Sequence, residues 1–471
     1  MNDIIKGMSV DEIEQVRSAT EHLLDREGFR VAHAGLRRLC RKAGARVDDA
    51  RETVQLPPEL LRQLLSQVPE SFDMIHASGR RTQVGGQTQH GMAIVTDPWI
   101  VDYTTQRPRR PVLDDVRRHT VIAQRLDCIQ SSSRMDFPVA DVAGPTSSLE
   151  AFETYFLHQN KHVLVYVTSM QQYQQYRDIG SILLDGRDVA GSGLMTVAVA
   201  LLTPLALTDL NAELLLAACR DGFAIVPTSC PIAGTTSPYT LAGTLLMGNV
   251  ENVFVAALSQ IVKPGNPFLY AHGPSRSDMQ SGHDQYYTLD KVLWKLGAVQ
   301  LARSYGLPVA AECGGAMTHR YDQQSGAEGV LFMAAAASSG AHLLAGFGSC
   351  YNAVGMSAEM MLIQTSWLHA ARFLQQGIRF DGGRLGAENI AAIGPGGSYL
   401  VDDLTLMHLR DDEFFHDELF DFGGETGDGR PLVARAHDRV EELTADPRCP
   451  HPEPIQAALR TYFDRQRAAL A

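Results

Sequence analysis

Aromatic and acidic side chains follow the ends of several short apolar runs in the middle of the chain. Aromatic faces attract cations, and quaternary ammonium groups most characteristically, because such a group cannot donate ordinary hydrogen bonds. Acidic residues accompany them at Asp97, Asp136 and Glu312. This combination predicts a pocket for a positively charged nitrogen, in which two to four of the aromatic residues contact the ligand. The candidates are Trp99, Tyr103, Phe137, Tyr166, Tyr239 and Tyr351.

Basic side chains in the same loops could hold the other end of such a ligand. Arginine binds a carboxylate through two parallel hydrogen bonds, and histidine can carry a proton or ligate a cofactor. The acidic residues could balance an ammonium group or orient the histidines. We therefore predict catalytic roles for Glu312, His319 and Asp136. The basic residues predicted to bind substrate are His272, Arg276 and Arg320.

Glycines cluster after the last two apolar runs, at Gly314, Gly315, Gly346 and Gly348. Without a side chain, glycine lets the backbone approach something large and flat, and we assign these four positions to cofactor binding. The chain has no GxGxxG opening a helix after a strand and no GxxxxGK[ST], so dinucleotide and P-loop sites are not expected. It also has no HExxH and no convincing Ser/His/Asp arrangement.

The seven cysteines are scattered and form no CxxC motif, which suits reduced thiols. Cys230, Cys313 and Cys350 each lie at or just after a predicted strand end. Three converging thiols could bind zinc, and a zinc-dependent thiol methyltransferase is therefore one function that the sequence leaves open. Small polarizable residues filling a packed core are the more ordinary explanation, so we predict no metal ligand.

The elements that must position these residues alternate regularly. Each of eight apolar runs is followed by a helix-like stretch, which is typical of a (β/α)8 TIM barrel. Active sites of this fold lie at the C-terminal ends of the strands. The predicted strands are Ala93–Thr96, Cys128–Ser132, His162–Thr168, Leu194–Leu201, Phe223–Pro227, Phe268–His272, Val309–Glu312 and His342–Phe347. The predicted helices fall near 113–126, 147–159, 170–184, 208–220, 239–262, 286–305, 326–339 and 357–376.

Three regions follow from this pattern. Residues 1–91 form an N-terminal cap of helices and a hairpin, in which Ser9 and Glu12 make a capping box. Residues 92–380 form the barrel, and residues 381–471 form a C-terminal helical extension.

Composition excludes some classes of binding partner and indicates where in the cell the protein works. A net charge of −13 over 471 residues argues against a nucleic-acid binder, which would show a basic face. No window approaches the roughly 20 uninterrupted apolar residues of a membrane span. The start of the chain lacks the basic and apolar segments of a secretory signal. We therefore expect a cytoplasmic protein, and the sequence leaves a homo-oligomer open.

Separate sequence blocks, in the same order, make the chain resemble the trimethylamine methyltransferase family nearly end to end. The family transfers a methyl group from a methylated amine to a corrinoid protein. The most specific block is Ala233–Gly243, continued by Gln260–Gly265. The other blocks are Met8–Glu14, Leu23–Gly28, Val54–Pro58, Ser277–Gly282, Leu301–Pro308, Asp322–Glu328 and Gly394–Gly397.

The resemblance implies a (β/α)8 barrel and a methyltransferase that uses cobalamin carried by a separate partner protein. Founding members contain pyrrolysine, which this chain lacks, and members without it include enzymes that demethylate glycine betaine. A quaternary amine also leaves as a neutral molecule and needs no acid, so the expected donor is a quaternary amine such as glycine betaine or a similar betaine. Carnitine, proline betaine, choline-like compounds and dimethylglycine stay open. A barrel protein that binds an osmolyte or a corrinoid without turnover is a second alternative. The segments 285–288 and 350–352 do not match a family pattern that could be carried over.

Overall fold

A curled parallel β-sheet occupies the centre of the protein, as the computed structural model shows for residues 5–95, 98–134, 138–411 and 413–470. In this described part of the chain the sheet has seven strands, in the order β13-β11-β10-β9-β6-β18-β17. The strands are β6 (His90–Ile94), β9 (Ile129–Arg134), β10 (His162–Val165), β11 (Met195–Ala200), β13 (Ala224–Thr228), β17 (Ala310–Glu312) and β18 (Leu343–Phe347).

The segment around Phe268 lies between the two edge strands of this sheet. Isolated parallel bridges join Ile225 to Phe268 and Tyr270 to Val309. Leu269 donates its N–H to the Ile225 carbonyl at 2.8 Å, and Ala310 donates to the Tyr270 carbonyl at 2.9 Å. The sequence predicts a regular strand here, but Pro267 in this segment and Pro227 and Pro308 in its two neighbours carry no N–H, and only these bridges form. The mixed α/β fold is confirmed, with a regular sheet of seven strands rather than eight.

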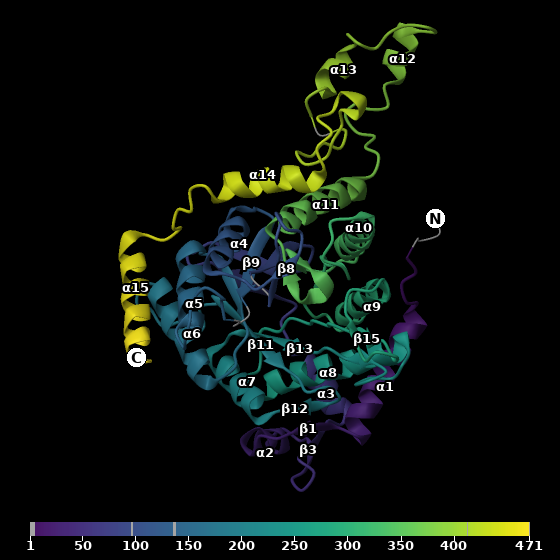
Figure 1. Ribbon diagram of the computed structural model, residues 1–471. Helices are drawn as coiled ribbons and strands as arrows, with labels where there is room; N and C mark the ends of the chain where they lie inside the picture. The colour runs from purple at the N-terminus through teal and green to yellow at the C-terminus, as the bar shows by residue number, and fades with distance from the viewer. Residues whose placement is uncertain (1–4, 96–97, 135–137, 412, 471) are drawn as a thin grey trace.

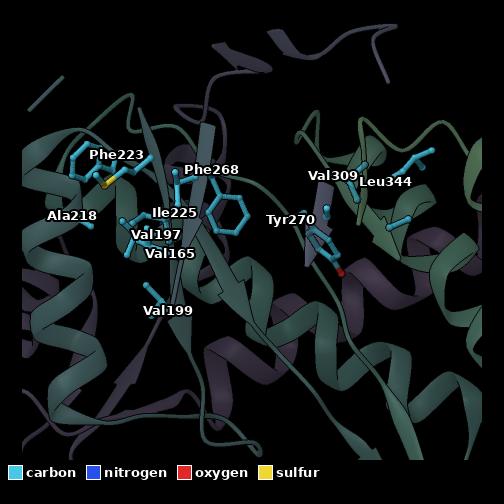
Figure 2. Packing of buried hydrophobic residues seen from close by; sticks show 14 of the residues in the cluster. Val165, Val197, Val199, Ala218, Phe223, Ile225, Phe268, Tyr270, Val309 and Leu344 are labelled. Carbon is cyan, nitrogen blue, oxygen red and sulfur yellow. The ribbon is translucent and has the colours of Figure 1, made fainter. Parts of the chain in front are cut away.

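Helices surround the sheet (Figure 1), and apolar residues fill the layer between them and the strands. Val197, Phe223 and Ile225 belong to this core and are buried, and Figure 2 shows them near Phe268, with Tyr270 toward Val309. The helices are α4 (Leu113–Arg125), α5 (Ser147–His158), α6 (Met170–Leu183), α7 (Asp209–Asp221), α8 (Leu241–Val262), α9 (Asp290–Ser304), α10 (Gln323–Ser338) and α11 (Ala358–Gln376).

Helix α8 is the most apolar of these helices. It is long and apolar enough to cross a membrane, but 72% of its most apolar window is buried inside the protein. Polar side chains on it have partners in the interior: Asn249, for example, donates to Thr20 at 2.7 Å and accepts from Tyr270 at 3.1 Å. Its hydrophobic character therefore reflects its position in the core of the fold.

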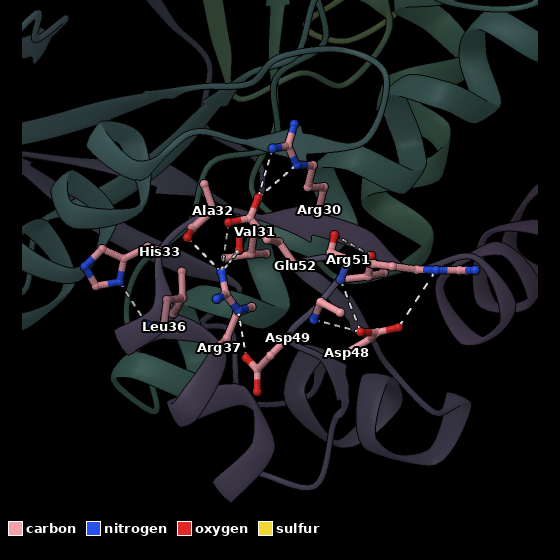
Figure 3. Close-up of polar contacts among 12 residues, drawn as sticks. Arg30, Val31, Ala32, His33, Leu36, Arg37, Asp48, Asp49, Arg51 and Glu52 are labelled. Carbon is pink, nitrogen blue, oxygen red and sulfur yellow. Dashed lines mark hydrogen bonds and ion pairs between the residues drawn. The ribbon is translucent and has the colours of Figure 1, made fainter.

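The N-terminal region packs against α8 and α9 and begins with the predicted capping box of Ser9 and Glu12. Arg37 connects the turns of this region. The Arg37 guanidinium donates to the carbonyls of Val31 and Ala32 and pairs with Asp49 at 3.1 Å (Figure 3). The elements are α1 (Val10–Arg26), β1 (Phe29–Val31), α2 (Ala34–Lys42), β2 (Arg46–Asp48), β3 (Thr53–Gln55), α3 (Pro58–Leu65) and β12 (Ala206–Leu207), which pairs with β1.

A β-hairpin formed by β4 (Ser71–Ile75) and β5 (Arg81–Gly85) closes the N-terminal end of the central sheet. Its apolar residues Phe72, Met74 and Val84 belong to one buried cluster with interior side chains of the strands. The predicted hairpin is confirmed, and it seals the end of the sheet opposite the expected site.

Short strands also lie in the loops of the fold. They are β7 (Trp99–Val101), β8 (Pro108–Arg109), β14 (Ile232–Ala233), β15 (Ser275–Ser277), β16 (Asp284–Gln285), β19 (Ser349–Cys350) and β20 (Gly355–Met356), with the 3-10 turn η1 (Tyr351–Ala353).

The C-terminal region divides into two parts. Helix α14 (Leu432–Thr444) packs on α11 and α4, and α15 (Glu453–Ala468) packs on α5 and α6. Between α11 and α14 the chain forms a projection, which we call the arm (residues 377–430), and Figure 1 shows it extending away from the body. It contains α12 (Ala387–Ile393), α13 (Asp403–His408) and the 3-10 turn η2 (Gly424–Thr426).

Candidate functional site

A cavity of about 110 Å³ opens at the C-terminal ends of the central strands. Apolar side chains from the interior of the sheet form its floor, including Met92, Leu164 and Leu269. Its polar wall is made by residues from the loops and from α9. This wall comprises Tyr166, Ser229, Cys230, Tyr286, Lys295 and Glu312.

Glu312, at the end of β17, is the centre of the polar wall. Its Oε2 lies 2.5 Å from Lys295 Nζ and 3.2 Å from Lys291 Nζ. Its Oε1 accepts a hydrogen bond from the Tyr286 hydroxyl at 2.7 Å. Lys295 also donates to the carbonyl of His272. One carboxylate therefore forms ion pairs with two buried ammonium groups.

The charges in this cluster shift one another's titration. Burial alone would raise the pKa of Glu312, but Lys291 and Lys295 outweigh it and hold that pKa well below its usual range. Burial lowers the pKa of Lys291 to about 7, although Glu312 opposes the shift. Burial and the nearby Glu312 raise the pKa of Tyr286. The carboxylate is therefore ionised and the tyrosine is a neutral donor, while Lys291 titrates near neutral pH.

Helix α9 and two loops position the cluster. Lys291 and Lys295 lie one turn apart on the same face of α9. The loop before this helix is fixed by Asn352, whose side-chain oxygen accepts the Tyr286 N–H at 2.7 Å. The two segments that matched no family pattern in the sequence therefore contact each other beside the cavity, and Tyr286 of the first lines it.

Two tyrosine rings line the cavity, Tyr166 and Tyr286. Lys291 Nζ lies 2.8 Å from the centroid of the Tyr286 ring. This is the contact that an aromatic face makes with an ammonium group, so the site already holds one cation in this way. Of the predicted aromatic residues, Tyr166 is the one that the described structure brings to this cavity.

The other predicted aromatic residues lie elsewhere. Trp99, on β7, is covered by the Arg110 guanidinium, whose Cζ is 4.0 Å from the ring. Tyr103 stacks on His437 at 3.7 Å and lines a separate polar cavity of about 320 Å³ beside α4, α11 and α14. Tyr239 is 60% exposed at the start of α8. These three do not form one aromatic cage, because Trp99 lies against Arg110, Tyr103 against His437, and Tyr239 is exposed.

His319 and Tyr351 contact each other outside the cavity. Their rings meet edge to face at 5.2 Å, and neither residue lines the cavity wall. The loop after β17 carries His319 several residues beyond the strand end, so proximity in sequence to Glu312 does not bring the two together.

The predicted basic residues are engaged by neighbours. Arg276 pairs with Asp290 at 3.1 Å, and Arg320, which is exposed, pairs with Asp322 at 2.7 Å. His272 touches the cavity, but its ring packs against α8, where a Cβ on Gly248 would lie 1.8 Å from its Nε2. Neither ring nitrogen of His272 has a hydrogen-bond partner within the described residues. The basic side chain of the cavity wall is Lys295, and Lys291 lies buried behind it, paired with Glu312 at 3.2 Å.

The glycine positions serve close packing within the fold. Gly315 has a φ of +132°, and a Cβ there would lie 2.4 Å from the Tyr287 ring. A Cβ on Gly314 would meet the Gly346 carbonyl at 2.7 Å, and one on Gly348 would meet Met356 at 2.4 Å. Gly346 alone of the four lines the cavity.

Asp136 and Phe137 lie outside the described residues, as does Asp97. The predicted thiols separate: Cys230 faces the cavity, whereas Cys313 and Cys350 are buried in the core. Among the residues that the structure describes, one group of three metal-type ligands lies close together: His408, Asp411 and Glu413 in the arm. The three thiols form no such group, so the geometry gives the zinc alternative no support.

Sequence reasoning missed Tyr286, Lys291 and Lys295. A signal for the lysines exists in the helical repeat, because they share a stripe with the buried Ala298 and Ala302. A lysine on the buried, apolar stripe of a helix indicates a paired buried charge rather than a solvated face.

A curled parallel sheet with a charged cavity at the C-terminal ends of its strands defines the class of α/β enzymes that act at this edge. The profile of the trimethylamine methyltransferase (MTTB) family matches residues 2–471, and the chain belongs to this family.

Curated relatives carry related names. The chain is 25% identical to a glycine betaine methyltransferase of Desulfitobacterium hafniense (strain Y51), over 97% of this chain and 96% of that protein. It is 24% identical to the trimethylamine methyltransferase MttB1 of Methanosarcina mazei, over 92% and 90%. The crystal structure of the Methanosarcina barkeri monomethylamine methyltransferase (MtmB) aligns with a TM-score of 0.48 and 13% identity, covering 93% of this chain and 92% of that one.

Proposed function

We propose that this protein transfers a methyl group from a quaternary amine, glycine betaine or a similar betaine, to the Co(I) of a corrinoid carried by a separate partner protein. The observation that carries the substrate assignment is the Lys291–Lys295–Glu312 cluster beside two tyrosine rings. Family membership supports the methyltransferase class.

The cluster favours an anionic group at one end of the substrate. With both lysines protonated, one carboxylate neutralises one of two buried ammonium groups, and a net charge of +1 remains. An unbalanced buried charge is costly, so a ligand carboxylate stabilises the site. An ammonium group has three N–H donors, and Lys295 points two of them at Glu312 and at the His272 carbonyl. Its position on the cavity wall lets the third reach a ligand.

The nitrogen end of a betaine would lie against the apolar floor and the face of Tyr166. A quaternary ammonium needs no hydrogen-bond acceptor there. Its C–N bond breaks as the electron pair of Co(I) attacks the methyl carbon, and the amine leaves as a neutral molecule. The residues of this chain contribute positioning and exclusion of water, so Glu312 acts by holding the lysines rather than by accepting a proton.

The surface around the cavity supports a protein partner. Met279, Leu289 and Val354 are exposed in loops that follow the C-terminal ends of the strands. Apolar exposure on the face where the cavity opens suits docking of the corrinoid protein. We further propose that segment 268–270 completes an eight-stranded barrel and that the enzyme works in the cytoplasm with reduced thiols, without nucleic acid or membrane partners.

The test is methylation of free cob(I)alamin, followed by absorbance, with glycine betaine, other betaines, choline and trimethylamine as donors. We expect transfer from a betaine and none from trimethylamine. Tyr166→Leu should raise KM about 2- to 30-fold, the equivalent of the roughly 0.5–2 kcal/mol of a cation–π contact. Tyr239→Leu removes an exposed tyrosine outside the cavity and is the matched control.

Two results would count against the proposal. Transfer from trimethylamine but not from betaines would refute the substrate assignment. Binding of a betaine by calorimetry, with no transfer to free or protein-bound corrinoid, would instead indicate a binding protein without turnover.

A further inference from the structure

The arm exposes far more apolar surface than the rest of the protein. Twelve of the 24 large hydrophobic residues that are exposed in the described chain lie in this segment of 54 residues. The most exposed are Ile378, Leu400, Val401 and Phe414, each at 81% or more. Scattered single exposures are ordinary in a soluble fold, but this concentration marks an interaction surface.

Phe415, Phe420 and Phe422 pack on one another where the arm returns to the body, but the outer part of the arm has no such core. Helices α12 and α13 have seven and six residues, and neither buries a single side chain, although both lie wholly in the described residues. A hollow of about 690 Å³ lies between them and is lined by Leu385, Ile390 and Phe414. Helices this short are not stable in isolation, so the arm needs a partner surface to keep its shape.

Polar contacts nevertheless give the arm a defined conformation. Asn389 donates to Asp402 at 2.8 Å, linking the two helices. Arg384 pairs with Glu413 at 2.8 Å, and Arg379 pairs with the same carboxylate at 2.9 Å. The segment is therefore built with its apolar side chains pointing outward rather than collapsed on itself.

The exposed area is sufficient for a stable complex. An aromatic side chain buries roughly 150–250 Å², and a Val, Leu, Ile or Met side chain roughly 60–120 Å². Scaled by their exposed fractions of 41% to 84%, the four aromatic and eight aliphatic side chains of the arm present roughly 700–1,300 Å². A stable interface takes about 800 Å² from each partner, and the largest apolar patch on a monomer is about 300–600 Å². The arm alone meets the requirement for one side of such an interface.

The place where the arm leaves the body argues against a partner that must reach the cavity. Helix α11 starts after β18 and runs back to the opposite end of the sheet, where Arg372 donates to the carbonyl of Gln89, next to the start of β6, at 3.5 Å. The arm begins there, away from the end of the strands where the cavity opens.

A receiving surface for the arm is present on the same chain. Leu374 at the end of α11 is 74% exposed, and Val330 and Leu331 on the adjacent α10 are 44% and 40% exposed. Helices α10 and α11 lie side by side near the base of the arm (Figure 1). The arm carries twelve acidic residues and four arginines, a net charge of −8, so two arms placed directly against each other would repel.

We propose that the arm packs across the α10–α11 face of a second copy of this chain, whose own arm packs on the first. Such an exchange is isologous, because both copies use the same two surfaces and the contact closes on itself. It covers the apolar side chains of the arm and those of the α10–α11 face together.

The test is the mass of the full chain at micromolar concentration, measured by light scattering after gel filtration. We expect an even multiple of the 51.5 kDa chain. Replacing Leu400 and Val401 by aspartate should halve that mass and leave the far-ultraviolet circular dichroism unchanged, because both side chains point away from their own chain. Val10→Asp alters a residue that is 81% exposed outside the arm and should leave the mass unchanged.

Cross-linking locates the contact. A photoreactive residue at position 400, in a mixture of ordinary and isotope-labelled chains, should give cross-links between chains that map to α10 and α11. A wild-type mass of 51.5 kDa or an odd multiple of it would overturn the proposal. So would an unchanged mass in the arm variant, or cross-links confined to one chain.

Discussion

Replacing Glu312 by glutamine tests the charge cluster at its centre. The substitution keeps the size of the side chain and an oxygen that can accept the Tyr286 hydroxyl, now 2.7 Å away. It removes the negative charge that lies 2.5 Å from Lys295 and 3.2 Å from Lys291. Two buried ammonium groups are then left facing each other without a counter-ion.

The expected loss of stability follows from these distances. At an effective dielectric constant of about 20, opposite charges 3.2 Å apart attract by about 5 kcal/mol. The cost of removing the charges from water offsets part of this, and breaking a buried pair typically costs about 3–5 kcal/mol. We expect the free energy of unfolding of Glu312→Gln to fall by about 3 kcal/mol or more at pH 6.

The loss should shrink as pH rises. Burial lowers the pKa of Lys291 to about 7 in the folded protein, below its ordinary value of 10.5. Between those values the unfolded chain binds more protons than the folded one, so stability rises with pH. Without Glu312 the folded pKa of Lys291 falls further and the lysine sheds its proton sooner. The penalty at pH 9 should therefore be smaller than at pH 6.

Urea unfolding followed by circular dichroism at several pH values measures both effects. Glu213→Gln on α7, where the carboxylate is exposed, is the matched control and should change stability by less than about 0.5 kcal/mol. A loss below about 1 kcal/mol at pH 6, or a loss that does not vary with pH, would refute the view that one carboxylate holds two buried lysines.

Two further predictions concern the same part of the molecule. Gly248→Ala should destabilise the protein by about 1–3 kcal/mol in thermal or urea unfolding, because the new Cβ would lie 1.8 Å from the His272 ring; a neutral effect would mean that the ring can move away freely. Betaine binding, measured by calorimetry, should weaken about tenfold, or about 1.4 kcal/mol, as pH rises through about 7 and Lys291 loses its charge, while choline binding should not weaken. The Lys291→Met variant should show no such pH step, and a step that persists in it would assign the titration to another group.

Much of the fold could be read from the alternation of apolar runs and amphipathic stretches. The predicted strand Leu194–Leu201 is β11 (Met195–Ala200), and the predicted helix 170–184 is α6 (Met170–Leu183), because a strand buried on both faces and a helix buried on one leave distinct periodicities. The segment Phe268–His272 has the same apolar signature, yet it forms only bridges. Apolar content reports burial, whereas ladder formation also depends on backbone N–H groups, which Pro227, Pro267 and Pro308 lack.

The site was predictable only where a side chain sits directly at a strand end. Glu312 and Tyr166 are in that position and both line the cavity. His319 and Arg320 lie farther along the loop, where the path of the backbone decides where a side chain points. Lys291 lies on a helix, and the residues around it in the sequence do not predict that its ammonium group pairs with Glu312, 21 residues away.

The hairpin of β4 and β5 has a consequence for the order of events in catalysis. Phe72, Met74 and Val84 fill the far end of the sheet, so in the described structure the cavity has its opening at the strand ends. If a protein acceptor docks on that same opening, it stands in the path of the small molecules. The donor must then enter before the acceptor docks, and the demethylated amine must wait for its departure. Turnover with this protein would follow a compulsory order. Excess acceptor would slow turnover, because an acceptor that docks first blocks the entry of the donor into the cavity.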